Sequence, residues 1–237
     1  MSASVLHYIY DPLCGWCYAA APLVKEARKV VSVQAHGGGM MTGSRRQQVT
    51  AQLRDYVMPH DRRISQLTGQ PFGERYFDGL LRDSSAVFDS EPPTAAMLAA
   101  EQMAGRGLDM LARLQTAHYV EGRRLADRDV LIEIATEMGM HRADFADALD
   151  ATLGDRAQAH IQETRELMGR VRASGFPTLL LQTEGRLRSV DIGPYLGQAQ
   201  AFRLWLQEQV PAKDVHPETG AFQCGPENCA IPGRSDT

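Results

Sequence analysis

Two cysteines separated by two residues carry the clearest chemical meaning in this sequence. Cys14-Gly15-Trp16-Cys17 follows a short apolar run and precedes a segment with helical periodicity that starts near Tyr18. A cysteine at a helix N-terminus faces unpaired backbone N–H groups and the positive end of the helix dipole, which favour its thiolate. The thiolate is the form that attacks a disulfide, and a second cysteine one turn later can resolve the mixed disulfide. The spacing therefore predicts thiol–disulfide exchange that begins at Cys14.

A second motif lies far along the chain, where Ser174-Gly175-Phe176-Pro177-Thr178 precedes three leucines. A proline next to a strand-like run is tolerated at an edge or at the first residue of a strand. A peptide bond before proline is also the one place where the cis form is cheap. The motif therefore allows a cis Phe176–Pro177 bond at the start of a strand, with an ordinary trans proline as the alternative; the cis form is what the family resemblance described next implies.

Together these motifs resemble the thioredoxin superfamily. Their wide separation resembles the DsbA-like branch, in which a helical domain interrupts the thioredoxin fold. Within that branch the chain is most similar to the FrnE-type predicted protein-disulfide isomerases, a resemblance that also rests on the segment 116–123. It implies an α/β chain, namely a thioredoxin fold with an inserted all-helical domain.

The resemblance also assigns roles to individual residues. It makes Cys14 the nucleophile and Cys17 the resolving cysteine, and it makes Pro177 the third member of the catalytic set, because a cis bond turns the preceding backbone toward the sulfurs. It places the substrate against Trp16, Phe176 and Thr178, although Trp16 could instead pack on the rim. Gly15-Trp16 lacks the histidine found between the cysteines of oxidising DsbA enzymes, which favours a reductase or isomerase over a strong oxidant.

Three further residues remain open to two interpretations. Asp11 lies three residues before Cys14, where it could shuttle a proton for Cys17 or cap the turn before the helix. Cys224 and Cys229 match a C-terminal C-x₄-C described for FrnE-type proteins, which makes them a tentative second redox pair; two idle thiols are the alternative. A zinc site built from all four cysteines fits the usual ligand spacing only loosely, so we predict no metal.

Composition narrows the classes of partner. The 237 residues are 43% hydrophobic with a net charge of −4 and a pI near 6.0, so a nucleic-acid partner is not expected. No apolar stretch approaches the roughly 20 residues of a membrane span. No Lys or Arg precedes the first apolar run, and Asp11 and Pro12 interrupt it, so we expect no export signal and a cytoplasmic protein. Paired cysteines in a reducing compartment are more often redox-active or metal-bound than structural.

The rest of the chain shows how these residues are positioned. We expect a strand over residues 4–10, a helix over 18–30 and a second strand over 30–35, followed by a glycine-allowed turn at His36-Gly37-Gly38-Gly39. Helical patterns then follow one another until strands return at 176–182 and 186–191, before a last amphipathic helix. The predicted organisation is a discontinuous thioredoxin-like domain over 1–44 and 173–210, a helical insertion over 45–172, and a tail over 211–237.

The sequence therefore predicts a thiol–disulfide oxidoreductase or isomerase that acts on protein or peptide thiols and disulfides. It would need no organic cofactor, because the cysteine pair itself carries the electrons as it cycles between dithiol and disulfide. The alternatives are an enzyme like the kappa-class glutathione transferases or 2-hydroxychromene-2-carboxylate isomerases, which do not need the second cysteine, and a peptide-binding chaperone with incidental thiols.

A double substitution tests the second cysteine pair. Replacing Cys224 and Cys229 by serine should change turnover or redox potential while leaving the melting temperature nearly unchanged, because a disulfide across so short a loop adds little stability. Insulin reduction of the variant gives its turnover, a redox titration against glutathione gives its potential, and thermal unfolding gives its melting temperature. A variant that matches the wild type in rate and in potential would make these cysteines bystanders.

Overall fold

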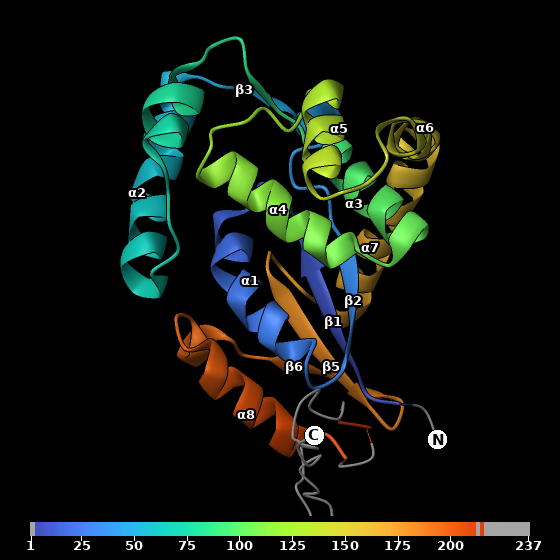
Figure 1. Ribbon diagram of the computed structural model, residues 1–237. Helices are drawn as coiled ribbons and strands as arrows, with labels where there is room; N and C mark the ends of the chain where they lie inside the picture. Colours follow the sequence, from blue (N-terminus) through green and yellow to red (C-terminus); the bar gives the residue numbers. More distant parts are fainter. Residues whose placement is uncertain (1–2, 212–213, 216–237) are drawn as a thin grey trace, which may run out of the picture.

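A four-stranded mixed sheet forms the centre of the molecule (Figure 1). The computed structural model describes residues 3–211 and 214–215, and the account that follows concerns these residues. The strand order is β2-β1-β5-β6. β1 (Val5–Tyr10) and β2 (Ser32–Gly37) run parallel, whereas β5 (Thr178–Thr183) is antiparallel to β1 and to β6 (Arg186–Val190). The two halves of the chain thus meet at β1 and β5.

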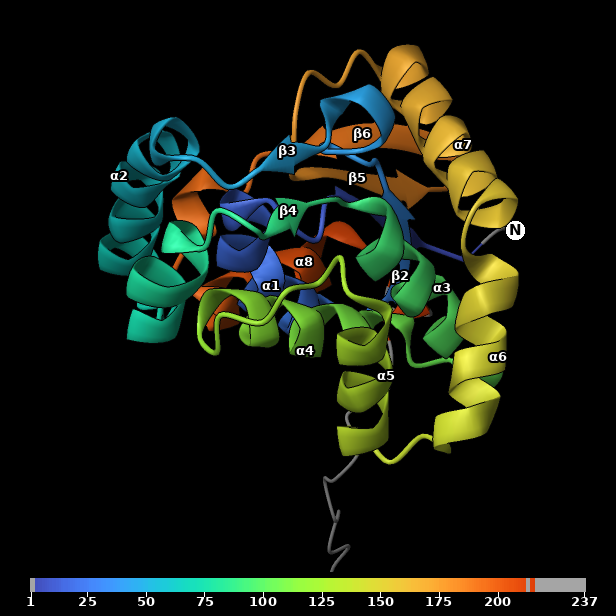
Figure 2. The ribbon, with the colours of Figure 1, turned by 90° about the horizontal axis from the view of Figure 1, so that it is seen from above.

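Helices cover both faces of this sheet, and the alternation of side chains along the strands shows why. Helix α1 (Gly15–Ala27) connects β1 to β2 and packs against α8 (Ala199–Gln209). Tyr8 and Leu181 belong to the apolar core on this side. Ile9 and Leu180 lie one residue away in each strand and pack with Met168 of α7 (Asp155–Val171) on the opposite side (Figure 2).

The insertion between β2 and β5 is helical, as expected, and the fold class is confirmed. Its elements before α7 are η1 (Gly43–Arg45), β3 (Gln47–Gln48), α2 (Ala51–Thr68), η2 (Arg75–Gly79), η3 (Leu80–Arg82), β4 (Val87–Phe88), α3 (Glu91–Ala104), α4 (Gly107–Tyr119), α5 (Arg128–Glu137) and α6 (Arg142–Thr152). The insertion is not purely helical, because β3 and β4 pair antiparallel over two residues each. Strands of that length are too short to show an alternating pattern in the sequence.

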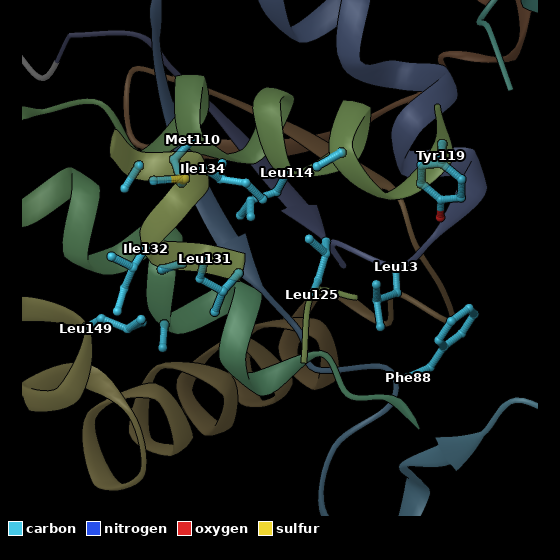
Figure 3. Close-up of a cluster of buried hydrophobic side chains, with 14 of the residues drawn as sticks. Leu13, Phe88, Met110, Leu114, Tyr119, Leu125, Leu131, Ile132, Ile134 and Leu149 are labelled. Atoms are coloured by element: carbon cyan, nitrogen blue, oxygen red, sulfur yellow. The ribbon is translucent and has the colours of Figure 1, made fainter. Parts of the chain in front are cut away.

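The insertion has a hydrophobic core of its own (Figure 3). Side chains from α4, α5 and α6 meet there, among them Leu114, Ile134 and Leu149. Leu13, which directly precedes the first cysteine, is buried in the same core. The insertion therefore anchors the loop that leads to the cysteine pair.

Helix α2 packs beside α1 and also contacts η3 of the insertion (Figures 1 and 2). Thr50 caps it by accepting a hydrogen bond from the Leu53 N–H group, and Gly69 ends it in the left-handed conformation that glycine favours. This placement brings one face of α2 to the start of α1.

Several sequence-based boundaries were wrong, among them those of the first helix and the second strand. The first helix begins at Gly15 rather than residue 18, because the carbonyl of Cys14 already accepts helical hydrogen bonds from Cys17 and Tyr18. The second strand covers Ser32–Gly37 rather than 30–35.

Within the part of the chain that the structure describes, no helix is both long enough and apolar enough to cross a membrane. Cys224 and Cys229 lie outside the described residues, so their pairing stays a prediction.

Candidate active site

Cys14 occupies the N-cap position of α1. Its backbone is extended, with φ −91° and ψ 115°, and its N–H group donates to the carbonyl of Asp11 at 3.2 Å. Its side chain makes no capping hydrogen bond, and the first turn of α1 contains no acidic residue. The sulfur therefore lies at the positive end of a 13-residue helix without a competing negative charge from that turn.

The second motif meets the first at this sulfur. The Sγ atom of Cys14 lies 3.5 Å from the carbonyl oxygen of Phe176, although the two residues are 162 positions apart. The Phe176–Pro177 peptide bond is cis. Thr178, the first residue of β5, pairs with Ile9 of β1, and its hydroxyl donates to the carbonyl of Gly175 at 2.8 Å. The structure thus brings together the residues that the sequence analysis had linked by resemblance.

Cys17 lies deeper than Cys14. The exposed fraction is 7% for Cys14 and 0% for Cys17, and both thiols are free. The Asp11 N–H group donates to Cys17 Sγ at 3.5 Å. Burial, followed by the hydrogen bond with Cys14, raises the pKa of the Cys17 thiol well above its usual value. Cys17 is therefore shielded from solvent, and its burial favours the protonated thiol.

Asp11 is buried and its carboxyl oxygens already have partners. Oδ1 accepts hydrogen bonds from the Leu13 N–H group at 2.9 Å and the Ser90 hydroxyl at 3.0 Å, while Oδ2 accepts from the Met40 N–H group at 2.5 Å. Burial raises its pKa even though these hydrogen bonds act in the opposite direction. These contacts join the cysteine loop to the segment after β2 and to the start of α3, which supports the turn-capping role. A proton shuttle to Cys17 stays a hypothesis.

A positively charged side chain that the sequence analysis missed holds Phe176 in place. The guanidinium of Arg165 lies 5.5 Å from the centre of the Phe176 ring and donates to the carbonyls of Gly38 and Gly39. A Cβ atom at Gly38 would lie only 2.2 Å from the same ring. The glycine run after β2 therefore makes room for the aromatic ring beside the sulfur. No local pattern reveals this contact, because its partners come from distant segments.

A cavity of about 210 Å³ opens beside the cysteine pair. Cys14, Gly15 and Trp16 line it together with Leu13 and with residues of α2, η2, β4, the end of α4 and the segment after β2. Trp16 is half-buried and also packs against the core between α1 and the sheet. Both interpretations of Trp16, contact with substrate and packing on the rim, agree with this position.

The cavity also contains a carboxyl group that the sequence analysis did not single out. Asp61 of α2 is 4% exposed, and the Tyr76 hydroxyl donates to its Oδ2 atom at 2.8 Å. Burial raises the pKa of Asp61 to about 7, although the hydrogen bond from Tyr76 opposes this shift. In the sequence Asp61 belongs to a polar helix and nothing distinguishes it from its exposed neighbours.

Tyr119, in the segment 116–123, lines this cavity. The ring of Tyr119 stacks on Tyr18 of α1 with centroids 4.8 Å apart, and Tyr76 packs edge-on against it. The neighbouring His118 is buried among aromatic rings, and burial lowers its pKa to about 3, so this imidazole stays neutral. Throughout the described ranges, no three His, Cys, Asp or Glu side chains come together in a way that would hold a metal ion.

Comparison with known proteins agrees with this geometry. Residues 5–192 match the family described as the DSBA-like thioredoxin domain. The cytosolic disulfide reductase DsbM from Pseudomonas aeruginosa is 58% identical, with a TM-score of 0.82 over 86% of this chain and 98% of that one. A structure of DsbM with GSH gives 56% identity and a TM-score of 0.80 over the same shares. A candidate protein disulfide isomerase from Nitrosomonas europaea shares the fold at 24% identity, with a TM-score of 0.71 over 87% and 99% of the two chains. No curated protein matches the chain.

The raised pKa of Asp61 makes stability depend on pH. A carboxyl whose pKa lies near 4 in the unfolded chain and about 7 in the folded one binds its proton more tightly when folded. The free energy of unfolding should therefore fall between about pH 4 and pH 7 by roughly 3 kcal/mol through this group. Asp61→Asn should remove that part of the decrease.

Urea unfolding of the two proteins at pH 4 and pH 8 measures the difference. Asp55→Asn on the exposed side of the same helix is the matched control and should follow the wild type. Parallel pH dependences for the wild type and Asp61→Asn would show that Asp61 titrates normally.

Proposed function

We propose that this chain, which belongs to the DSBA-like thioredoxin domain family, is a disulfide reductase that uses Cys14 as nucleophile and Cys17 as resolving cysteine. Thiol–disulfide oxidoreductase activity is common to the family and to DsbM, which is 58% identical to this chain. The single observation that supports the assignment of residues is the position of Cys14, at the N-cap of α1 and against the Phe176 carbonyl, with Cys17 buried beneath it.

The order of the two steps follows from the difference in exposure between Cys14 and Cys17. The Cys14 thiolate attacks a substrate disulfide, so that a Cys14–substrate bond forms, the substrate disulfide breaks and one substrate sulfur leaves and takes a proton. Cys17 then gives up its proton and attacks Cys14. The Cys14–Cys17 disulfide forms and the second substrate sulfur leaves as a thiol. Two electrons pass from the protein dithiol to the substrate.

The backbone around the cis bond supplies the surface for the substrate chain. Phe176 is held between Gly38 and Arg165 with its carbonyl at the Cys14 sulfur, so an extended peptide beside Phe176 would present its own sulfur to Cys14. We place Trp16 and Thr178 at the two ends of this surface, and Pro177 as the residue that orients it. Protein or peptide disulfides are the substrates that fit such a backbone surface.

Reduction is the favoured direction. The Gly15-Trp16 dipeptide carries no imidazole that would stabilise the Cys14 thiolate, and the relative DsbM is a cytosolic disulfide reductase. DsbM has also been solved with GSH, so we propose glutathione as the thiol that returns the oxidised enzyme to its dithiol form. The comparison with the cytosolic DsbM also supports a cytoplasmic site of action for this chain. The reaction as written needs no organic cofactor.

The alternative enzymes fit the site less well. An enzyme like the kappa-class glutathione transferases or 2-hydroxychromene-2-carboxylate isomerases has no use for a second cysteine. Here Cys17 is hydrogen-bonded to Cys14 and buried directly behind it, which is the arrangement that resolution requires. A chaperone with incidental thiols would slow insulin aggregation without speeding insulin reduction.

Trapping the intermediate tests this function. Cys17→Ser should accumulate a mixed disulfide with glutathione at Cys14 after exposure to glutathione disulfide, because the resolving thiol is gone. Intact mass and peptide mapping locate the adduct, and insulin reduction by this variant should fall by at least about 100-fold. Cys14→Ser is the matched control and should form no adduct within the cysteine motif. Full insulin reduction by Cys14→Ser would overturn the proposal.

A further inference from the structure

We propose that Asp61 donates the proton to the substrate thiolate that is released when Cys14 attacks, and that Tyr76 positions its carboxyl group. This inference rests on the proposed function, because it takes Cys14 as the nucleophile. It assigns a chemical task to the helical insertion, since Asp61 and Tyr76 both belong to it, from α2 and η2.

The contact between Asp61 and the cysteine motif is direct. A Cβ atom at Gly15 would lie 2.6 Å from Asp61 Oδ1 and 3.0 Å from Ile64 Cδ1. Glycine is therefore the residue between the cysteines that lets α2 approach the first turn of α1 so closely. The carboxyl group sits against the residue that directly follows Cys14, in the wall of the cavity that Cys14 also lines.

The surroundings of Asp61 keep its proton available near neutral pH. Among the described residues that line the cavity, Asp61 is the only acidic one, and its Oδ2 atom accepts a hydrogen bond from the Tyr76 hydroxyl. Burial is the largest influence on its pKa, which is raised to about 7. No cationic side chain in the described part of the chain contributes to that shift.

Other titratable groups also lie at this cavity. Tyr76 of η2 and Tyr119 of α4 are buried, and burial raises the pKa of both hydroxyls well above the usual range. Tyr56 and His60 lie on α2 itself and line the same cavity. Cys14 lines the cavity from the start of α1, and both Cys14 and Cys17 add to the raised pKa of Tyr119.

The proposed step couples the charges of two groups. The Cys14 thiolate and an Asp61 carboxylate would both occupy the N-terminal end of α1, so a negative charge on one disfavours a negative charge on the other. Asp61 therefore keeps its proton while Cys14 is a thiolate. When Cys14 bonds to the substrate sulfur, its charge moves to the leaving sulfur as the substrate disulfide breaks. Asp61 then gives its proton to that sulfur and regains one from water in the open cavity.

The pKa values of the donor carboxyl and of the leaving thiol favour this proton transfer. An alkyl thiol has a pKa of about 8.5, so its thiolate is a basic leaving group that gains from protonation. An acid with a pKa near the working pH is the most effective donor. An aromatic thiolate such as nitrothiobenzoate leaves readily without a proton. The contribution of Asp61 should therefore depend on the leaving group.

Two disulfides distinguish this role from a structural one. Asp61→Asn keeps the size of the side chain and an oxygen that can accept from Tyr76. In single-turnover reactions of the reduced protein at pH 7, this variant should react with glutathione disulfide about 100-fold more slowly than the wild type. Its reaction with dithiobis(nitrobenzoate) should stay within about threefold. Asp55→Asn, an exposed change on the same helix, should leave both rates unchanged.

A second variant provides an independent test in case Asp61→Asn misfolds. Tyr76→Phe removes the hydrogen bond that lowers the Asp61 pKa, so the pH above which glutathione disulfide reduction declines should move upward. Equal losses with both disulfides in Asp61→Asn, no loss with either, or an unmoved pH profile in Tyr76→Phe would overturn the inference. Reduction that survives in Cys14→Ser would instead overturn the proposed function.

Discussion

The N-terminal end of α1 is the constraint on which the rest of the structure depends. A thiolate is stable there only while the helix dipole acts on it without another negative charge close by. The first turn of α1 contains no acid, and the nearest buried carboxyl in the cavity has a pKa near neutrality instead of a permanent charge. A carboxyl group whose pKa is raised by burial can lie close to the Cys14 sulfur with less opposition to thiolate formation.

Two separate parts of the chain converge on that helix end. The β5 side brings the Phe176 carbonyl to Cys14, and Gly38 and Arg165 hold its ring. The insertion brings α2 to Gly15 from the other side and buries Leu13 in its own core. The reactive sulfur thus lies between the thioredoxin-like sheet and the insertion, and residues of both define the space around it.

The sequence was sufficient for features that are local or chemically distinctive. The cysteine spacing, the Phe176–Pro177 motif and the helical periods of the insertion led to the fold class and to the residues that meet at the site. The start of α1 was misplaced because Gly15 and Trp16 carry no helical periodicity, although hydrogen bonds to the Cys14 carbonyl already begin the helix. Asp61 and Arg165 could not be predicted, since each acts through a partner far away in sequence and looks like an ordinary surface residue of a polar helix.

The central claim is that Cys14 reacts with its substrate in the space bounded by Phe176 and Asp61. The most direct test is a crystal structure of the Cys17→Ser variant joined to glutathione. The account predicts a disulfide to Cys14, with the glutathione backbone beside Phe176 and the cavity at Asp61 open toward the sulfur–sulfur bond. A glutathione that is bonded to Cys14 but points away from both, so that Asp61 has no path to the departing sulfur, would contradict it.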